Sequence, residues 1–166
     1  MLVLGVDPGT RHLGYGLIEA DGPTMRCAAW GTIEGGKNRP LHQRLHVIHQ
    51  SLAEVMERWK PQHLAIEEPF VAPERGAKSA IAVGQAQAVA LILAAAAEIE
   101  IHRYSPSQVK SSVANYGAGS KTQIQRTVQI LLGMDDSPMS EDASDALAVA
   151  LCHVQHWRAT ERLRPR

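Results

Sequence analysis

The first ten residues constrain this chain most, because they combine a buried strand with an acidic residue at its end. Residues 2–6 form a short apolar run rich in branched side chains. Such a run is typical of a strand covered on both faces, and so of a central strand in a sheet. Pro8 and Gly9 stop the strand directly after Asp7. Considered alone, Asp7 is best explained as a turn residue. In open α/β sheets, however, binding sites lie at this end of the strands, where other carboxylates can lie beside Asp7.

The segments that follow occur in an order typical of an α/β protein. Residues 13–18 and 25–33 are apolar stretches separated by a turn signal at 21–23, so the first three strands should form an antiparallel meander. The later strands enter by crossovers, which predicts a mixed sheet of three antiparallel strands, then two parallel strands, with helices on both faces. The later segments are a helix at 40–59, a strand at 63–68, a helix at 78–98, a strand at 100–104 and helices at 106–114, 120–132 and 140–157.

Size and composition agree with one globular domain in the cytoplasm. Of the 166 residues, 45% are hydrophobic and 20% are charged, which is typical of a globular protein. The net charge is zero, so overall charge neither favours nor disfavours a nucleic acid partner. Cys27 and Cys152 lack a metal-binding pattern and should be reduced thiols. No signal peptide is visible. We expect a single domain over 1–157 and a frayed basic tail over 158–166.

The helix expected at 78–98 is apolar nearly all round and rich in alanine. Its most apolar stretch, 88–97, is too short to span a bilayer, so no membrane partner is predicted. A helix without a polar face must be covered on more than one side. The sheet covers one side, and either a second subunit or the rest of the same domain covers another.

Three histidines share one face of the helix expected at 40–59. His42, His46 and His49 have the spacing at which helical histidines bind a transition metal. No cysteine or carboxylate at a matching spacing completes a ligand set. Solvated side chains are therefore the favoured interpretation.

Four acidic residues stand at positions that this topology can bring together. Glu67 ends the fourth strand and is followed by Glu68, and Asp142 and Asp145 share one face of the last helix. If the fourth strand lies beside the first, a glutamate reaches Asp7, and the packed helix adds its aspartates. Each residue alone is more simply a surface acid, and only the joint placement indicates a site.

Carboxylates that converge in a buried site need a cation, because each raises the pKa of the others. Mg²⁺ prefers oxygen ligands and leaves positions for water and phosphate oxygens. Two such ions about 3.5–4 Å apart stabilise the attacking and leaving oxygens in phosphodiester hydrolysis. The acid set therefore indicates metal-dependent phosphodiester chemistry.

The segment before the last helix has the composition of a nucleic acid contact. Residues 101–134 contain no acidic side chain, and serines and threonines alternate there with basic residues such as Lys110 and Lys121. Lysine, arginine, hydroxyl groups and helix N-termini are the usual contacts to a phosphate backbone. Phe70, the only phenylalanine, begins the loop expected at 71–78. It either stacks on an unpaired base or closes the core.

Six short motifs occur in a fixed order along the chain. They are Gly5-Val-Asp-Pro-Gly-Thr10, Ala65-Ile-Glu-Glu-Pro-Phe70, Val83-Gly-Gln-Ala86, Gln108-Val-Lys110, Lys121-Thr-Gln-Ile-Gln125 and Asp142-Ala-Ser-Asp-Ala-Leu147. Each is weak alone, but together they closely resemble the RuvC family of Holliday-junction resolvases over nearly the whole chain. The resemblance implies a ribonuclease-H-like fold and a homodimer that cuts four-way DNA junctions in recombination and repair. It also implies association with the RuvA and RuvB branch-migration proteins.

The resemblance assigns the acids to catalysis. Asp7, Glu67, Asp142 and Asp145 match the family's catalytic acids, which would hold two Mg²⁺ ions, with Mn²⁺ as a possible substitute. Asp7 would bridge the two ions. In-line attack by water would leave a 5′-phosphate and a 3′-hydroxyl.

The resemblance also assigns DNA contacts. Phe70 matches a phenylalanine near the junction centre. Lys110 and Lys121 match lysines that hold the phosphate backbone, with Lys121 close to the catalytic site. Arg75 and Lys78, in the loop after the fourth strand, are further expected DNA contacts.

Departures from the family pattern leave the preferred cleavage sequence open. The loop at 71–78 is longer than in many relatives, Gln87 replaces an arginine, and Asn115-Tyr116 replaces a glycine-containing pair.

Two other classes of protein are alternatives to a junction resolvase. An actin-like or sugar-kinase ATPase needs a second copy of the first motif, which this chain lacks. A non-catalytic junction-binding module is disfavoured by the four intact acids.

Overall fold

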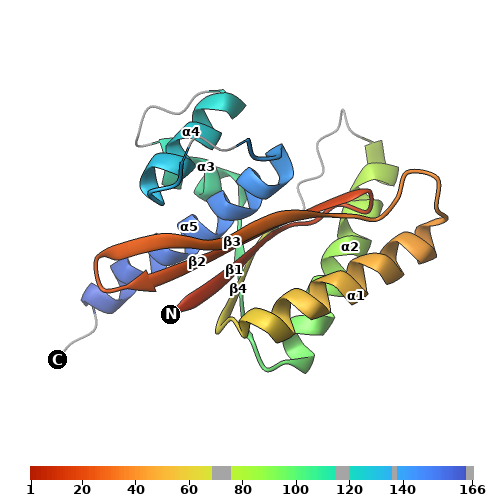
Figure 1. The fold of residues 1–166 in the computed structure, drawn as a ribbon, viewed down its shortest axis with the longest axis horizontal. Coiled ribbons are helices and arrows are strands. Elements are labelled where there is room, and N and C mark those ends of the chain that lie inside the picture. The colour runs from red at the N-terminus through yellow and green to blue at the C-terminus, as the bar shows by residue number, and fades with distance from the viewer. Residues whose placement is uncertain (69–75, 115–119, 136–137, 164–166) are drawn as a thin grey trace.

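The computed structural model describes residues 1–68, 76–114, 120–135 and 138–163, and its centre is a five-stranded sheet with helices on both faces (Figure 1). Across the sheet the strand order is β3-β2-β1-β4-β5, so β1 is central. In chain order the elements are β1 (Leu2–Asp7), β2 (His12–Asp21), β3 (Thr24–Glu34), α1 (Leu41–Trp59), β4 (His63–Glu67), α2 (Gly76–Ala96), β5 (Glu100–Tyr104), α3 (Pro106–Ala114), α4 (Lys121–Leu131) and α5 (Glu141–Leu163).

The sheet is mixed, as the sequence predicts. β1 pairs antiparallel with β2 and parallel with β4, while β2–β3 is antiparallel and β4–β5 is parallel. Val3, Leu4 and Val6 are fully buried, which confirms that β1 is covered on both faces. Because β1 and β4 run in the same direction, Asp7 and Glu67 end at the same edge of the sheet.

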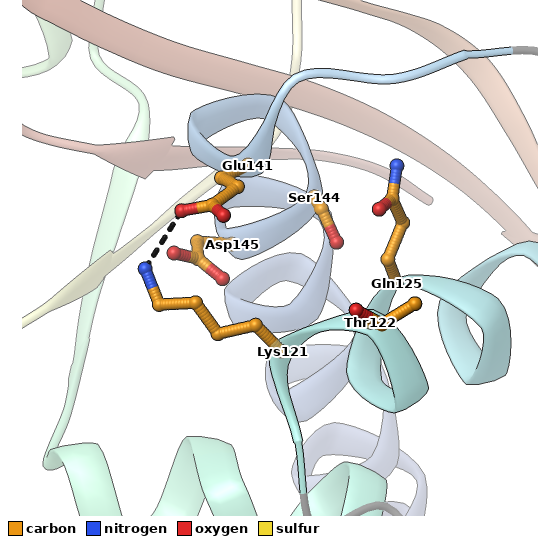
Figure 2. Close-up of a pocket in the computed structure, with 6 residues that line it drawn as sticks. All are labelled: Lys121, Thr122, Gln125, Glu141, Ser144 and Asp145. Atoms are coloured by element: carbon orange, nitrogen blue, oxygen red, sulfur yellow. Dashed lines mark hydrogen bonds and ion pairs between the residues drawn. The ribbon is translucent and has the colours of Figure 1, made fainter.

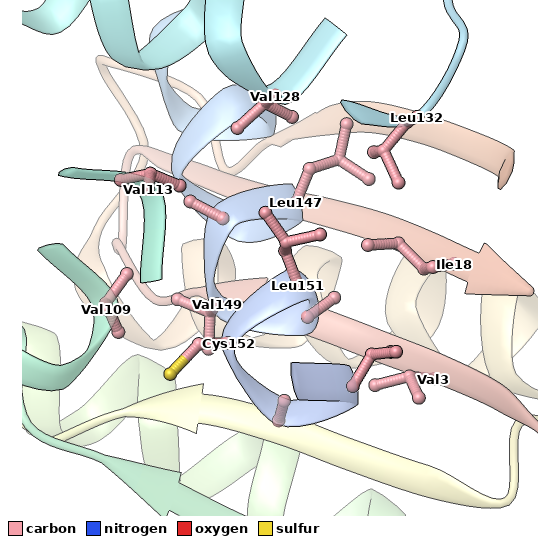
Figure 3. Close-up of a cluster of buried hydrophobic side chains, with 14 of the residues drawn as sticks. Val3, Ile18, Val109, Val113, Val128, Leu132, Leu147, Val149, Leu151 and Cys152 are labelled. Atoms are coloured by element: carbon pink, nitrogen blue, oxygen red, sulfur yellow. The ribbon is translucent and has the colours of Figure 1, made fainter. Parts of the chain in front are cut away.

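Two hydrophobic cores lie on opposite faces of the sheet. Successive side chains of a strand point to opposite faces, so Leu4 and Val6 join the core formed with α1 and α2. Val3 points to the opposite face of the sheet, into the core that α5 forms with α3 and α4 (Figure 3). Leu147 and Leu151 of α5 are fully buried there, and burial of each such side chain contributes about 1.5–3 kcal/mol.

The last helix is longer than the sequence predicts. α5 continues past the expected end at residue 157 to Leu163. Arg158 is anchored, since its Nη2 donates a hydrogen bond to the carbonyl oxygen of Thr24 at 2.7 Å. At the other end, the hydroxyl of Ser140 accepts a 3.2 Å hydrogen bond from the backbone N–H of Ala143, which caps the helix.

Helix α2 is not buried wholly inside its own domain. Ala86, Gln87, Ala90 and Ala94 are its buried residues. Within the described part of the chain, residues 77–96 form the one helix that is long and apolar enough to cross a membrane. The apolar composition of α2 therefore extends beyond the ten-residue stretch at 88–97. A single apolar helix is weak evidence for a membrane span, because the core helices of soluble proteins share that composition.

The histidines of α1 are solvated, as the sequence predicts. His42, His46 and His49 are all exposed. The apolar stripe of the same helix is buried, with Ile48 and Leu52 fully covered. The histidine face therefore carries no buried ligand set.

Candidate active site

Two parallel strands deliver two carboxylates to one edge of the sheet. Val6 and Ile66 are direct partners in the β1–β4 ladder, so Asp7 and Glu67 follow them side by side. The backbone at Glu67 is also held from α2, where the buried amide of Gln87 donates a 3.1 Å hydrogen bond to the Glu67 carbonyl oxygen. Sequence reasoning treated Gln87 only as a departure from the family pattern. The sequence does not separate Gln87 from Gln85 on the same helix, because only the structure shows that Gln87 is buried.

Glycines let α5 approach the sheet closely enough to add its aspartates. A Cβ at Gly14 would overlap the backbone oxygen of Asp142, and a Cβ at Gly5 would overlap the backbone of Ala146. The helix backbone therefore rests directly on the backbones of β1 and β2. Gly14 is also the ladder partner of Asp7. The first turn of α5 is thus placed over the acidic end of β1.

Electrostatics show that the four predicted acids converge. Burial, and after it the neighbouring charges of Asp145, Asp142 and Glu67 in that order of effect, raise the pKa of Asp7 to about 7. The ammonium of Lys121 opposes this rise. Burial also raises the pKa of Asp145. The joint placement that sequence reasoning required is therefore present.

Lys121 and Glu141 lie beside Asp145 (Figure 2), and both side chains are exposed. Lys121 Nζ lies 2.8 Å from Glu141 Oε2. Ser120 caps α4 through a capping box with Gln123, which places Lys121 in the first turn of that helix. Glu141 also raises the pKa of Asp145. Sequence reasoning missed this fifth acid, although it directly precedes Asp142.

A small pocket lies between the start of α4 and the start of α5 (Figure 2). Polar side chains form most of its wall, and it opens beside the carboxylate of Asp145. Its lining residues are Lys121, Thr122, Gln125, Glu141, Ser144 and Asp145.

The other predicted DNA contacts are only partly placed by the structure. Lys78 is exposed near the start of α2, and Lys110 is exposed on α3. Phe70 and Arg75 lie outside the described residues.

The acid cluster fits a hard divalent cation. Its donors are all carboxylate oxygens, which Mg²⁺ prefers. Burial and the charges of the three neighbouring carboxylates oppose the ionisation of Asp7 at neutral pH, since together they raise its pKa to about 7. A bound cation removes that penalty, so Asp7, Glu67, Asp142 and Asp145 have the chemistry of a metal-binding set.

Comparison with known proteins identifies the family. Residues 3–153 match the family model described as crossover junction endodeoxyribonuclease RuvC. The chain belongs to the RuvC family. A crossover junction endodeoxyribonuclease RuvC of Dehalococcoides mccartyi (strain 195) is 43% identical over 156 residues, covering 94% of this chain and 93% of the relative. RuvC proteins are metal-dependent nucleases, in agreement with the acid cluster.

Solved structures support the same assignment. The structure titled T. thermophilus RuvC in complex with Holliday junction substrate superposes with a TM-score of 0.87 at 32% identity, covering 96% of each chain. The yeast mitochondrial Holliday junction resolvase Ydc2 superposes with a TM-score of 0.67 at 14% identity, a likeness of fold alone. The predicted ribonuclease-H-like fold is confirmed by these neighbours and by the mixed sheet.

Gln87→Leu should slow catalysis without weakening DNA binding. Loss of the hydrogen bond to the Glu67 carbonyl should cost about 1 kcal/mol of stability. It should also loosen the Glu67 carboxylate and lower the single-turnover cleavage rate about 10-fold, by analogy with residues that orient metal ligands. Gln50→Leu, at an exposed position on α1, is the control. Equal losses in rate and in junction affinity would contradict a positioning role for Gln87.

Proposed function

We propose that this chain is a structure-selective endonuclease that resolves four-way DNA junctions by hydrolysing one phosphodiester bond in each of two strands. The observation that carries the proposal is the convergence of Asp7, Glu67, Asp142 and Asp145 at one end of the sheet. Membership of the RuvC family supports the reaction. The substrate is supported by the similarity to a RuvC solved with a Holliday junction. The products are nicks with 5′-phosphate and 3′-hydroxyl ends.

The four acids are the proposed metal ligands. They would hold two Mg²⁺ ions, for which Mn²⁺ can substitute. When bound, such ions stabilise the attacking and leaving oxygens of phosphodiester hydrolysis. Lys121 is proposed to hold a phosphate oxygen beside the acids, and its ion pair with Glu141 orients the ammonium before DNA binds.

Further DNA contacts are proposed outside the acid cluster. Lys110 and Lys78 would hold the phosphate backbone through their exposed ammonium groups. Phe70 is proposed to contact the junction near its centre, and Arg75 is proposed to contact DNA. We also propose one nuclease domain that extends to the end of α5 at Leu163, a cytoplasmic location, and cooperation with the RuvA and RuvB branch-migration proteins in recombination and repair.

Lys121→Gln should weaken the contact with phosphate. Loss of one ammonium should reduce the slope of log affinity against log salt by about 1 and lower the cleavage rate at physiological salt. Lys60→Gln removes the same charge near the start of β4, at the strand end opposite Glu67, and is the matched control. Fluorescence anisotropy over a salt series measures both variants. Identical slopes for the two variants would exclude a phosphate contact at Lys121.

A homodimer is proposed through α2. Ile81 and Ile92 are 62% and 64% exposed and lie three helical turns apart on one face. A second copy related by a two-fold axis would cover this face and supply two equivalent sites, as symmetric cleavage requires.

Ile92→Asp should therefore raise the dissociation constant of the dimer about 100-fold, because a carboxylate would be buried in the interface. Ile130→Asp, on the similarly exposed Ile130 of α4 (65%), is the control. Sedimentation velocity measures the change. A monomeric native protein, or equal behaviour of the two variants, would contradict the α2 interface.

The proposed function is tested by incubating the protein with a synthetic mobile four-way junction and linear duplex controls, with Mg²⁺ or Mn²⁺. Paired, symmetric and ligatable nicks confined to the junction are expected. Equal cutting of duplex would indicate a general metal nuclease. Tight junction binding without cutting would indicate a binding module. Product mapping would also give the preferred cleavage sequence.

A further inference from the structure

A second cluster of ionisable side chains lies away from the acids. His63, His102 and His153 each offer a nitrogen, and these atoms lie within 4.8 Å of one another. His63 begins β4, whereas Glu67 ends it. His153 lies eight residues after Asp145 on α5, about 12 Å along the helix axis. The histidine cluster is therefore at the other end of the sheet from the proposed nuclease site.

Strand register and one helix bring these residues together. His63 pairs with Glu100 in the parallel β4–β5 ladder, and His102 is two residues further along β5. Because alternate residues share a face, His63, Glu100 and His102 line the same face of the sheet. α5 covers this face and adds His153, whose ring centroid lies 4.2 Å from that of His102.

The donor atoms of His63, His102 and Glu100 have nearly the spacing of a tetrahedral zinc site. Nδ1 of His63 lies 3.0 Å from Nε2 of His102. Oε1 of Glu100 lies 3.2 Å from that same nitrogen of His102, and Oε2 lies 3.8 Å from Nδ1 of His63. Bonds of 2.0–2.1 Å in a tetrahedron place donors about 3.3 Å apart. Small side-chain adjustments would therefore suffice to hold one ion.

The buried histidine is already oriented for coordination. His153 is 1% exposed, and its Nδ1 lies 2.7 Å from the hydroxyl of Tyr104. Its Nε2 is buried without a hydrogen-bond partner among the described residues, which is unusual for a buried polar atom. Burial and the neighbouring histidines also lower the pKa of His153 to about 3, so the ring is neutral. A hydrogen bond that fixes one imidazole nitrogen while the other faces a metal is typical of zinc sites.

We propose that His63, His102, His153 and Glu100 form a structural Zn²⁺ site. Three imidazoles and one carboxylate suit zinc and do not suit Mg²⁺, which prefers oxygen ligands. The bound ion would tie β4 and β5 to α5, the helix that also carries Asp142 and Asp145. This site is independent of the proposed nuclease function and would persist in a variant that cannot cleave DNA.

The test is a Co²⁺ titration of the full-length protein after removal of metals, with excess Mg²⁺ present to occupy oxygen ligands. We expect the strong visible absorption of four-coordinate Co²⁺, saturation at one ion per chain, and displacement by Zn²⁺. His102→Gln should abolish the signal. Glu100→Gln, at a side chain that is 66% exposed, should weaken Zn²⁺ binding at least 10-fold without affecting folding. Asp7→Asn and His46→Gln should retain the site.

Three results would overturn the proposal. They are a native protein without the four-coordinate signal, an unchanged signal in the Glu100→Gln and His102→Gln variants, and loss of the signal in Asp7→Asn. Thermal melting gives a second readout, since a ligand that binds only the folded state raises the melting temperature. Zn²⁺ should raise it in the native protein and much less in Glu100→Gln. If His102→Gln fails to fold, Glu100→Gln still decides the outcome.

Discussion

Asp7→Asn should lower the rate of junction cleavage by about 10³-fold or more, while junction affinity stays equal or becomes tighter. The substitution keeps the shape of the side chain but removes the charge that a divalent cation needs at the centre of the acid cluster. A 10³-fold loss corresponds to about 4 kcal/mol of transition-state stabilisation. Single-turnover cleavage and an electrophoretic mobility assay measure the two quantities. Cleavage near the native rate would refute the assignment of the catalytic acids.

The same substitution should stabilise the metal-free protein. The pKa of Asp7 is about 7 in the folded state and about 3.9 in an unfolded chain. Its charge therefore costs folding free energy, a cost that is absent below pH 3.9, grows as the pH rises and is complete above pH 7.

Asp7→Asn should accordingly raise the free energy of unfolding at pH 8 by about 1–3 kcal/mol, and the gain should vanish near pH 4. Asp21→Asn, at an exposed acid on β2, is the control and should change stability by less than about 0.5 kcal/mol. Urea unfolding in metal-free buffer measures both variants. A lower stability of Asp7→Asn at pH 8 would mean that Asp7 has a structural role.

Gly14→Ala should damage both folding and catalysis. The added methyl group would overlap the backbone oxygen of Asp142, and neither backbone can move without displacing α5 from the sheet. Overpacking of this kind costs about 3 kcal/mol of unfolding free energy or more. Because the first turn of α5 carries Asp142 and Asp145, the cleavage rate should fall even where the variant remains folded.

The control for this prediction is Glu19→Ala on the same strand, at an exposed ion pair with Arg26. Such a pair contributes at most about 1 kcal/mol. Urea unfolding measures stability, and cleavage below the melting temperature measures activity. A Gly14→Ala variant with native stability and native cleavage would show that α5 does not need this close contact.

Local patterns predicted most of the secondary structure. The apolar run of β1 predicted a strand covered on both faces, and the stripe of α1 predicted both its buried face and its solvated histidines. Periodicity reports which side of a segment is buried, so these features needed no knowledge of neighbouring elements. It could not locate the end of α5, where the hydrogen bond from Arg158 to Thr24 joins residues 134 positions apart.

The candidate active site was predicted in part. Asp7, Glu67, Asp142 and Asp145 stand at strand ends and on one helix face, and these positions can be read from the chain. The ion pair of Glu141 with Lys121 and the hydrogen bond from Gln87 could not be read from the chain, because each depends on how a helix packs against its neighbours. The exposure of α2 is a similar case, since an apolar helix looks the same whether its own domain or another copy covers it.

By itself, the sequence determined the order of elements, the acids at the end of β1 and β4, and the family. Only the tertiary structure decided which backbones touch and which distant side chains meet. The glycines beneath α5 and the cluster of His63, His102 and His153 belong to that second group. The physical reason is that contacts between distant residues depend on strand register and helix placement, whereas local periodicity reports only burial along one segment.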